Sequence, residues 1–203
     1  MLNRYARVFF TRVFTPIARA LLARGLSPDV VTIVGTVGVC VSALALYPRG
    51  QLFWGSLLIA FFAFTDLIDG TMARLSGRSS PWGAFLDSTM DRVGDGAIFG
   101  GLILYFTGRV ERPLDAYLAL LCLVLGFVTS YTKARAEGLG LRCGGGIAER
   151  ADRLTVTLVT TGFCGLFLPL WVLTLVLALL AVASLVTVGQ RVAMVHAQTR
   201  MPG

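Results

Sequence analysis

Long apolar segments separated by short polar breaks organise this chain. The pattern predicts six helical segments, at Pro28–Tyr47, Leu52–Leu75, Gly83–Phe106, Leu114–Ala136, Asp152–Leu168 and Trp171–Val195. Several of these runs are long enough to cross a bilayer, which takes an α-helix of about 20 residues. Proline and glycine, which end helices, mark the breaks, as in Pro-Arg-Gly at 48–50 and Gly-Gly-Gly at 144–146. We therefore expect an all-α integral membrane protein with six transmembrane helices.

Composition supports a membrane protein and excludes an ordinary soluble domain. The 203 residues are 56% hydrophobic, with a mean hydropathy of +0.77. Residues 1–25 carry five arginines spread among apolar residues, which favours an amphipathic juxtamembrane helix over a cleavable signal peptide or a first transmembrane helix. No second domain is apparent, so 1–203 is expected to be one membrane domain with its six-helix core at 28–195. The four cysteines show no zinc spacing, and we expect no structural disulfides.

The basic residues are distributed very unevenly between the two sides that six spans define. One side carries both termini and fifteen cations, whereas the other keeps three, Arg49, Arg109 and Arg112. The fifteen are Arg4, Arg7, Arg12, Arg19, Arg24, Arg74, Arg78, Arg92, Lys133, Arg135, Arg142, Arg150, Arg153, Arg191 and Arg200. This asymmetry predicts a multi-pass protein of the cell membrane with cytoplasmic termini. The net charge of +7 suggests anionic lipid headgroups and phosphorylated substrates, and no motif indicates nucleic acid.

An acidic motif lies at the predicted cytoplasmic ends of the second and third spans. Asp66 and Asp69 are three residues apart, and Asp87 and Asp91 are four apart, so each pair shares a helix face. Carboxylates near a membrane interior are costly unless they are paired or bind a cation. Oxygen-only ligands suit Mg²⁺, Mn²⁺ or Ca²⁺ rather than zinc, and two such ions can hold a pyrophosphate. The alternative is a solvated rim in which these aspartates pair with neighbouring arginines.

Asp95 follows Asp91 by one further turn and belongs less clearly to the metal motif. We expect it to hydrogen-bond between helices or to support the site indirectly. Gly70 and Ala73 share the stripe of Asp66 and Asp69 and leave room beside the backbone. Arg74 at the helix end is suited to grip a phosphate group. The stripe therefore indicates a site for a phosphate-bearing ligand.

The complete spacing, Asp-x2-Asp-Gly-x2-Ala-Arg-x8-Gly-x3-Asp-x3-Asp, resembles the signature of the CDP-alcohol phosphotransferases. All eight fixed residues are present: Asp66, Asp69, Gly70, Ala73, Arg74, Gly83, Asp87 and Asp91. The resemblance implies a juxtamembrane helix, six transmembrane helices, a homodimer, two divalent metal ions and a CDP-activated lipid that releases CMP. It implies that the four aspartates hold the metals, with Asp91 also the general base. It further implies that Gly70, Ala73, Arg74 and Gly83 line the nucleotide and pyrophosphate pocket, with Asp29 and Thr32 near the cytidine.

Cations from three later spans suggest a separate site for an anionic acceptor. They lie in Ser-Tyr-Thr-Lys-Ala-Arg-Ala-Glu at 130–137, Glu-Arg-Ala-Asp-Arg at 149–153 and Gln-Arg at 190–191. A phosphate favours several cationic hydrogen-bond donors, although positive-inside anchoring is the alternative explanation for any one of them. These segments resemble the actinobacterial phosphatidylinositol phosphate synthases, whose acceptor is inositol 1-phosphate. That resemblance implies an acceptor-phosphate site at Thr132, Lys133, Arg153 and Arg191.

The resemblance, together with the acidic motif, implies a phosphatidyltransferase that uses CDP-diacylglycerol, inositol 1-phosphate and Mg²⁺, with Mn²⁺ as a possible substitute. A phosphatidylglycerophosphate synthase using glycerol 3-phosphate has the same chemistry and also needs a phosphate pocket. A cation transporter lined by aspartates is disfavoured, because the acids cluster at one membrane face and do not continue through the later spans. A purely structural or lipid-scaffolding protein would tolerate loss of the aspartates.

Overall fold

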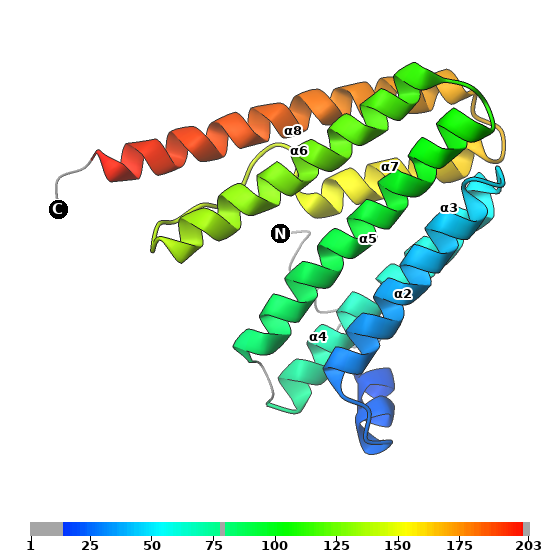
Figure 1. Ribbon diagram of the computed structural model, residues 1–203. Helices are drawn as coiled ribbons and strands as arrows, with labels where there is room; N and C mark the ends of the chain where they lie inside the picture. Colours follow the sequence, from blue (N-terminus) through cyan, green and yellow to red (C-terminus); the bar gives the residue numbers. More distant parts are fainter. Residues whose placement is uncertain (1–13, 78–79, 201–203) are drawn as a thin grey trace.

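The structure, a computed structural model, describes residues 14–77 and 80–200, and these are helical with short connections and no strands (Figure 1). The helices that follow the N-terminal segment are α2 (Pro28–Leu46), α3 (Leu52–Ala63), α4 (Thr65–Leu75), α5 (Pro81–Gly108), α6 (Pro113–Gly138), α7 (Arg150–Cys164) and α8 (Leu170–Thr199). Helices α2, α5, α6 and α8 pack in that order, and α7 packs on α8 and α3, which returns to α2. The expected all-α class is confirmed.

Serine caps fix the starts of the two helices that flank the acidic motif. The Ser27 hydroxyl accepts a hydrogen bond from the Val30 amide, 3.3 Å away, and α2 begins at the following proline. The Ser80 hydroxyl accepts in the same way from the Gly83 amide at 3.1 Å, and α5 also begins at a proline. Serine caps and a proline in the first turn satisfy or remove amides that lack helical partners. Residues 29 and 83 are thereby placed in first turns, beside the acidic motif.

Four helical stretches are long and apolar enough to cross a membrane: Pro28–Leu46, Leu52–Leu75, Pro113–Gly138 and Leu170–Thr199. Helix α5 has the length but carries Asp87, Asp91, Arg92 and Asp95 between its start and its middle. Helix α7 has 15 residues, about 22 Å at 1.5 Å per residue, against a hydrocarbon core of about 30 Å. The multi-pass character expected from the sequence is thus supported directly by four stretches, and α5 and α7 lie in the same bundle (Figure 1).

The segment expected as one span at Leu52–Leu75 is interrupted at Phe64. Helix α3 ends at Ala63 and α4 begins at Thr65, with Phe64 between them. The Thr65 hydroxyl donates to the Phe62 carbonyl oxygen at 2.6 Å, and such local bonds compete with the backbone hydrogen bonds of a helix. No proline or glycine marks this position, so the pattern of apolar residues gave no sign of it. The interruption places Asp66 in the first turn of α4, where the helix dipole favours a negative charge.

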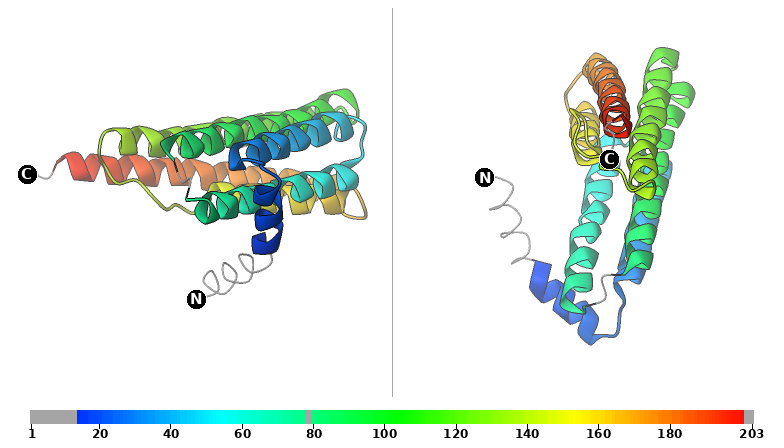
Figure 2. Two further views of the ribbon diagram at one scale, coloured as in Figure 1. Left: turned by 90° about the horizontal axis from the view of Figure 1, so that it is seen from below. Right: turned by 90° about the vertical axis from the view of Figure 1, so that its left-hand side faces the viewer.

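The expected juxtamembrane helix is only partly within the described residues. Phe14–Ala23 is helical, whereas residues 1–13, including Arg4, Arg7 and Arg12, lie outside them. Figure 2 shows the described segment turned away from the direction of the bundle near the end of α4. Arg19 and Arg24 are exposed and Ala18 is fully buried, which is the two-sided character expected of an amphipathic helix.

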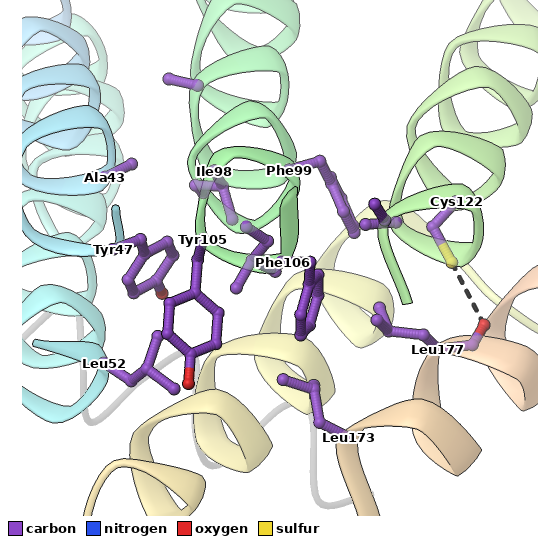
Figure 3. Close-up of a cluster of buried hydrophobic side chains, with 14 of the residues drawn as sticks. Ala43, Tyr47, Leu52, Ile98, Phe99, Tyr105, Phe106, Cys122, Leu173 and Leu177 are labelled. Carbon is purple, nitrogen blue, oxygen red and sulfur yellow. Dashed lines mark hydrogen bonds between the residues drawn. The ribbon is translucent and has the colours of Figure 1, made fainter. Parts of the chain in front are cut away.

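The apolar core fills the end of the bundle opposite the acidic motif. Its aromatic members Tyr47, Phe99 and Phe106 lie together with aliphatic side chains from α3 and α8 (Figure 3). Tyr47 is fully buried, and its hydroxyl pairs with the Ser56 hydroxyl at 2.9 Å. All four cysteines are free, as expected; Cys122 packs in this core. The packed end therefore anchors α2, α3, α5, α6 and α8, and the acidic residues lie beyond it on α4 and the first part of α5.

Candidate active site

The acidic motif lines one cavity of about 530 Å³ between α2, α4 and the start of α5. Its walls bring together residues that are far apart in sequence: Pro28, Asp29, Thr32, Asp66, Asp69, Gly70, Ala73, Arg74, Ser80, Pro81, Gly83, Ala84 and Asp87. Every residue that the resemblance assigned to the CDP-lipid pocket is among them. Asp91 is the one fixed residue of the motif that lies elsewhere, in an adjoining cavity.

Helix α2 supplies the hydrogen-bond partner of the most buried motif carboxylate. The Thr32 hydroxyl donates to Asp69 Oδ2, and both side chains are buried. The Thr32 oxygen also lies 3.2 Å from the Pro28 carbonyl oxygen, its alternative acceptor. At the mouth of the same cavity, the Trp82 indole donates to Asp29 Oδ2 at 3.1 Å. The two α2 residues expected near the cytidine therefore bridge to α4 and α5.

Small residues and Arg74 shape the other wall of this cavity. Arg74 Nη2 donates to the Thr71 hydroxyl at 3.0 Å, so the guanidinium is held beside its own helix. A methyl group added at Gly70 would lie 3.7 Å from Arg74 Nη1, which places that glycine directly beside the guanidinium. Arg74 forms no ion pair with a described carboxylate, so the alternative of a salt-bridged rim does not apply to it.

The motif carboxylates interact electrostatically but are not gathered into one cluster. Asp66, Asp69 and Asp87 lie within electrostatic reach of one another. Within residues 14–77 and 80–200, no three acidic, histidine or cysteine side chains are close enough together to hold a metal ion. The chemistry of the set nonetheless fits a hard divalent cation, because all its donors are carboxylate oxygens and these three form no ion pair with any described residue.

A second cavity, of about 450 Å³, adjoins the first and is largely apolar. Asp66 lines both, while Asp91 and Arg150 line only the second. Its other walls come from α2, α3, α5 and α7, with aliphatic residues such as Val39, Ile59 and Leu158. A polar cavity that joins an apolar one at a carboxylate suits a ligand with a charged head and a hydrocarbon tail.

Arg150 bridges Asp91 and Asp95, whereas from the sequence it was expected only as part of the cationic segment 149–153. Its Nη1 lies 2.8 Å from Asp91 Oδ1, and its Nε and Nη2 each lie 3.0 Å from Asp95 Oδ1. Asp95 is 2% exposed and also lies 3.3 Å from Arg92 Nη2. The expectation that Asp95 hydrogen-bonds between helices is confirmed. Two carboxylates one helical turn apart need a compensating cation. From the sequence, the presence of both Asp91 and Asp95 could therefore have indicated that an arginine from another helix lies beside them.

The four residues expected at the acceptor phosphate are not brought into one cavity. Thr132 and Arg191 line a cavity of about 330 Å³ between the ends of α6 and α8. Arg191 donates to the carbonyl oxygens of Gly145 and Thr129. Lys133 is half exposed and lies 3.9 Å from Glu137 of its own helix.

Arg153, the remaining member of that set, is 2% exposed between α6 and α7. Its Nη1 donates to the Ala148 carbonyl oxygen at 3.3 Å, and a methyl group added at Gly126 would lie 3.0 Å from its Nη2. Two of the four expected residues are therefore buried arginines that are held by backbone carbonyl groups.

Comparison with known proteins agrees with this site. The family model for CDP-alcohol phosphatidyltransferase matches residues 26–139, which include the whole acidic motif. The chain belongs to the CDP-alcohol phosphatidyltransferase family. It is 52% identical over 205 aligned positions to the phosphatidylinositol phosphate synthase of Streptomyces avermitilis, covering 98% of this chain and 84% of that protein. It is 45% identical to the Mycolicibacterium smegmatis protein of the same name, covering 97% and 88%.

Solved structures of this transferase family have the same fold. The phosphatidylinositol phosphate synthase of Mycobacterium tuberculosis with CDP-DAG bound aligns with a TM-score of 0.87 and 44% identity, covering 91% of this chain and 94% of that chain. The structure of that protein with manganese and citrate aligns with a TM-score of 0.86 and 45% identity, covering 90% and 88%. A divalent cation and a CDP-activated lipid have therefore both been seen on this fold.

Proposed function

We propose that the protein transfers the phosphatidyl group of CDP-diacylglycerol to inositol 1-phosphate, giving phosphatidylinositol phosphate and CMP. The observation that carries this proposal is the 530 Å³ cavity, whose walls contain the whole CDP-lipid set of the motif together with Asp29 and Thr32. The acceptor is inferred from the high identity, over almost the entire chain, to proteins named phosphatidylinositol phosphate synthase.

The charged and apolar parts of the donor suit the two adjoining cavities. The cytidine would lie near Asp29 and Thr32, and the pyrophosphate near Gly70, Ala73, Arg74 and Gly83, all of which line the polar cavity. The diacylglycerol part would follow the apolar cavity, which begins at Asp66. Lipid donor would then enter from the bilayer while its nucleotide stays in the polar cavity.

Asp91 is the proposed general base. It accepts the proton of an inositol hydroxyl while that oxygen bonds to the lipid-side phosphorus, and the bond from this phosphorus to the CMP oxygen breaks. Asp66, Asp69, Asp87 and Asp91 would hold two divalent ions, Mg²⁺ or alternatively Mn²⁺. When bound, such ions offset the charge on the pyrophosphate and on the leaving oxygen. Arg74 adds a fixed positive charge on the same wall.

Arg153 and Arg191 are the proposed anchors of the acceptor phosphate, with Thr132 and Lys133 beside them. Both arginines are buried and donate to neutral carbonyl oxygens, which form weaker hydrogen bonds with a guanidinium than an anionic phosphate does. An arriving phosphate would replace those carbonyl groups as the acceptor. Half-exposed Lys133 is free to turn from its 3.9 Å contact with Glu137, because exposed ion pairs of this kind contribute little.

In the proposed membrane arrangement, all six helical segments cross the bilayer and both termini are cytoplasmic, with the active site at the cytoplasmic face. The charge asymmetry supports this orientation. Like the family it resembles, the protein is proposed to act as a homodimer. Light scattering of the purified protein, corrected for bound detergent, tests that assembly.

The proposed reaction is tested by CMP release from CDP-diacylglycerol and Mg²⁺ with purified protein. Inositol 1-phosphate, glycerol 3-phosphate and free inositol are compared in parallel reactions. Release with inositol 1-phosphate alone is the expected result. Release with glycerol 3-phosphate instead would keep the mechanism and overturn the acceptor. Absence of release with all three, from folded and metal-loaded protein, would contradict the proposal and direct attention to ion flux in liposomes.

A further inference from the structure

Asp95 is a buried carboxylate that the proposed reaction does not use. It lies one helical turn beyond Asp91 on α5 and lines neither cavity at the acidic motif. Arg150, at the start of α7, contacts both residues. The guanidinium thus connects the proposed general base to an acid that lies deeper in the bundle.

We propose that Asp95 and Arg150 are positioning residues that orient Asp91 for proton transfer; this inference rests on the proposed role of Asp91. Arg150 Nη1 lies 2.8 Å from Oδ1, one of the two carboxylate oxygens of Asp91. The other oxygen, Oδ2, has among the described residues only the long 3.8 Å ion pair with Arg92. Oδ2 is therefore the oxygen of Asp91 that Arg150 leaves open toward a substrate hydroxyl. Asp95 holds the opposite side of the guanidinium through Nε and Nη2.

The shape of the guanidinium is required for this arrangement. Three of its nitrogens reach two carboxylates from one rigid plane, and Nη2 also lies 3.4 Å from the Asp91 carbonyl oxygen. A lysine ammonium carries the same charge at a single point and cannot reproduce this fork. Arg150→Lys therefore keeps the charge next to Asp91 while it removes the link to Asp95.

The surrounding packing argues for positioning rather than for general support of the fold. Among the described helices, α5 packs mainly on α2 and α6, whereas α7 packs on α3 and α8, and α5 and α7 share no extensive contact. The apolar cavity separates them, with Asp91 and Gly94 on one wall and Arg150 and Leu154 on the other. The bridge from Arg150 spans this cavity, so its loss alters the Asp91 carboxylate without removing a packed interface.

The test compares Arg150→Lys, Asp95→Asn and the double variant in the CMP-release assay. We expect kcat to fall about 100-fold for Arg150→Lys and about 10-fold for Asp95→Asn, because small displacements of a reacting group cost rates of this order. KM for CDP-diacylglycerol should stay within about 3-fold of the wild-type value, because neither residue lines the nucleotide cavity and Arg150→Lys keeps a cation on the wall of the apolar cavity. The double variant should be no slower than Arg150→Lys, since both changes break one linkage.

A matched control lies at the opposite end of the bundle. Arg112 Nε is 2.6 Å from Asp115 Oδ2, and Asp115 is 1% exposed, so this ion pair resembles the Arg150–Asp95 pair in chemistry and burial. Arg112→Lys and Asp115→Asn should lower the melting temperature and leave kcat unchanged. If they slow the reaction as much as the Arg150 and Asp95 variants do, the positioning role is wrong.

Two further readouts distinguish a loss of Asp91 positioning from a loss of folding and from a loss of bound metal. Binding of Mn²⁺ to Arg150→Lys, followed by electron paramagnetic resonance, should keep the wild-type stoichiometry. Added guanidinium should restore part of the kcat of Arg150→Ala and should not affect Arg112→Ala. Normal kcat in both Arg150→Lys and Asp95→Asn would overturn the inference while wild-type turnover stands. A wild-type protein that releases no CMP would instead overturn the proposed function.

Discussion

The motif aspartates differ at the residue scale because each has a different partner. Asp69 is buried and accepts from Thr32, Asp91 pairs with Arg150, and neither Asp66 nor Asp87 forms an ion pair with a described residue. Their spacing was predictable from the sequence, because residues three and four apart share one helix face. Their partners come from α2 and α7, which lie far away in the chain, and no local pattern specifies which distant side chain reaches which carboxylate.

Asp91→Asn should remove turnover while substantial metal binding remains. The amide keeps the size of the side chain but accepts a proton very poorly, so kcat should fall about 10²–10⁴-fold, the usual contribution of a general base. CMP release and Mn²⁺ binding on the same preparation check this. Asp152→Asn, at an exposed position on α7, is the control and should behave as wild type. Full activity in Asp91→Asn would rule out its assignment as the base.

Thr32→Val should weaken metal binding because it leaves Asp69 without its hydroxyl donor. Loss of a group that orients a metal ligand typically lowers metal affinity about 10-fold to 100-fold. A Mn²⁺ titration of turnover measures the effect as a higher metal concentration at half-maximal rate. Thr32→Ser keeps the hydroxyl and should restore most of the affinity. Equal metal dependence in the valine variant and the wild type would show that this hydrogen bond has no part in metal binding.

At the scale of the helices, the sequence predicted where helices begin and end better than it predicted interruptions within them. The expected starts and ends of the α2 and α6 segments, Pro28–Tyr47 and Leu114–Ala136, lie within two residues of the observed ones, because prolines and glycines mark those breaks. The interruption at Phe64 was not predicted, since it lies inside a continuous apolar run, next to the hydrogen bond of the Thr65 hydroxyl. The start of α7 was expected at Asp152, and the structure begins it at Arg150, the residue that reaches α5.

Gly101→Ala should destabilise the packing of α5 on α2. A methyl group at this position would lie 2.6 Å from the Ala43 carbonyl oxygen, and backbone cannot move aside as a flexible side chain can. Overpacking of this kind typically costs about 1–3 kcal/mol. Thermal unfolding in detergent, followed by size-exclusion chromatography, should show a lower melting temperature.

Gly100→Ala is the matched control on the same helix, because its added methyl group would meet no described atom within 4 Å. It should leave the melting temperature unchanged or raise it slightly, since alanine favours helix over glycine. An equal loss of stability in the two variants would mean that helix flexibility, rather than contact with Ala43, makes glycine necessary at position 101.

At the scale of the whole molecule, packing and chemistry occupy opposite ends of the bundle. The apolar core joins the ends of α2 and α5 to the starts of α6 and α8, and the polar cavity lies at the other end. The apolar cavity extends between them, from Asp66 to the core residues Val39, Ile59 and Ile98. Charge follows the same division, because among the described basic residues Arg49, Arg109 and Arg112 lie in the connections at the core end. A close-packed end can hold helices rigidly while their other ends surround ligands. The separation of the apolar core from the acidic motif was predictable from the sequence, because apolar and charged residues segregate along each span. The shapes of the cavities were not predictable, because they depend on tertiary packing.

The charge division predicts the orientation of the whole molecule in the membrane. A green fluorescent protein fused after residue 200 should fluoresce, because it folds only in the cytoplasm, and alkaline phosphatase at the same point should be inactive. The same reporters placed after Val110, in the connection between α5 and α6, should give the opposite pair of signals. Changing Arg49, Arg109 and Arg112 to neutral residues should not alter this pattern, because fifteen cations remain on the other side. Phosphatase activity at the C-terminal fusion with fluorescence at Val110 would invert the orientation and place the acidic cavities outside, where cytoplasmic CDP-diacylglycerol headgroups cannot reach them.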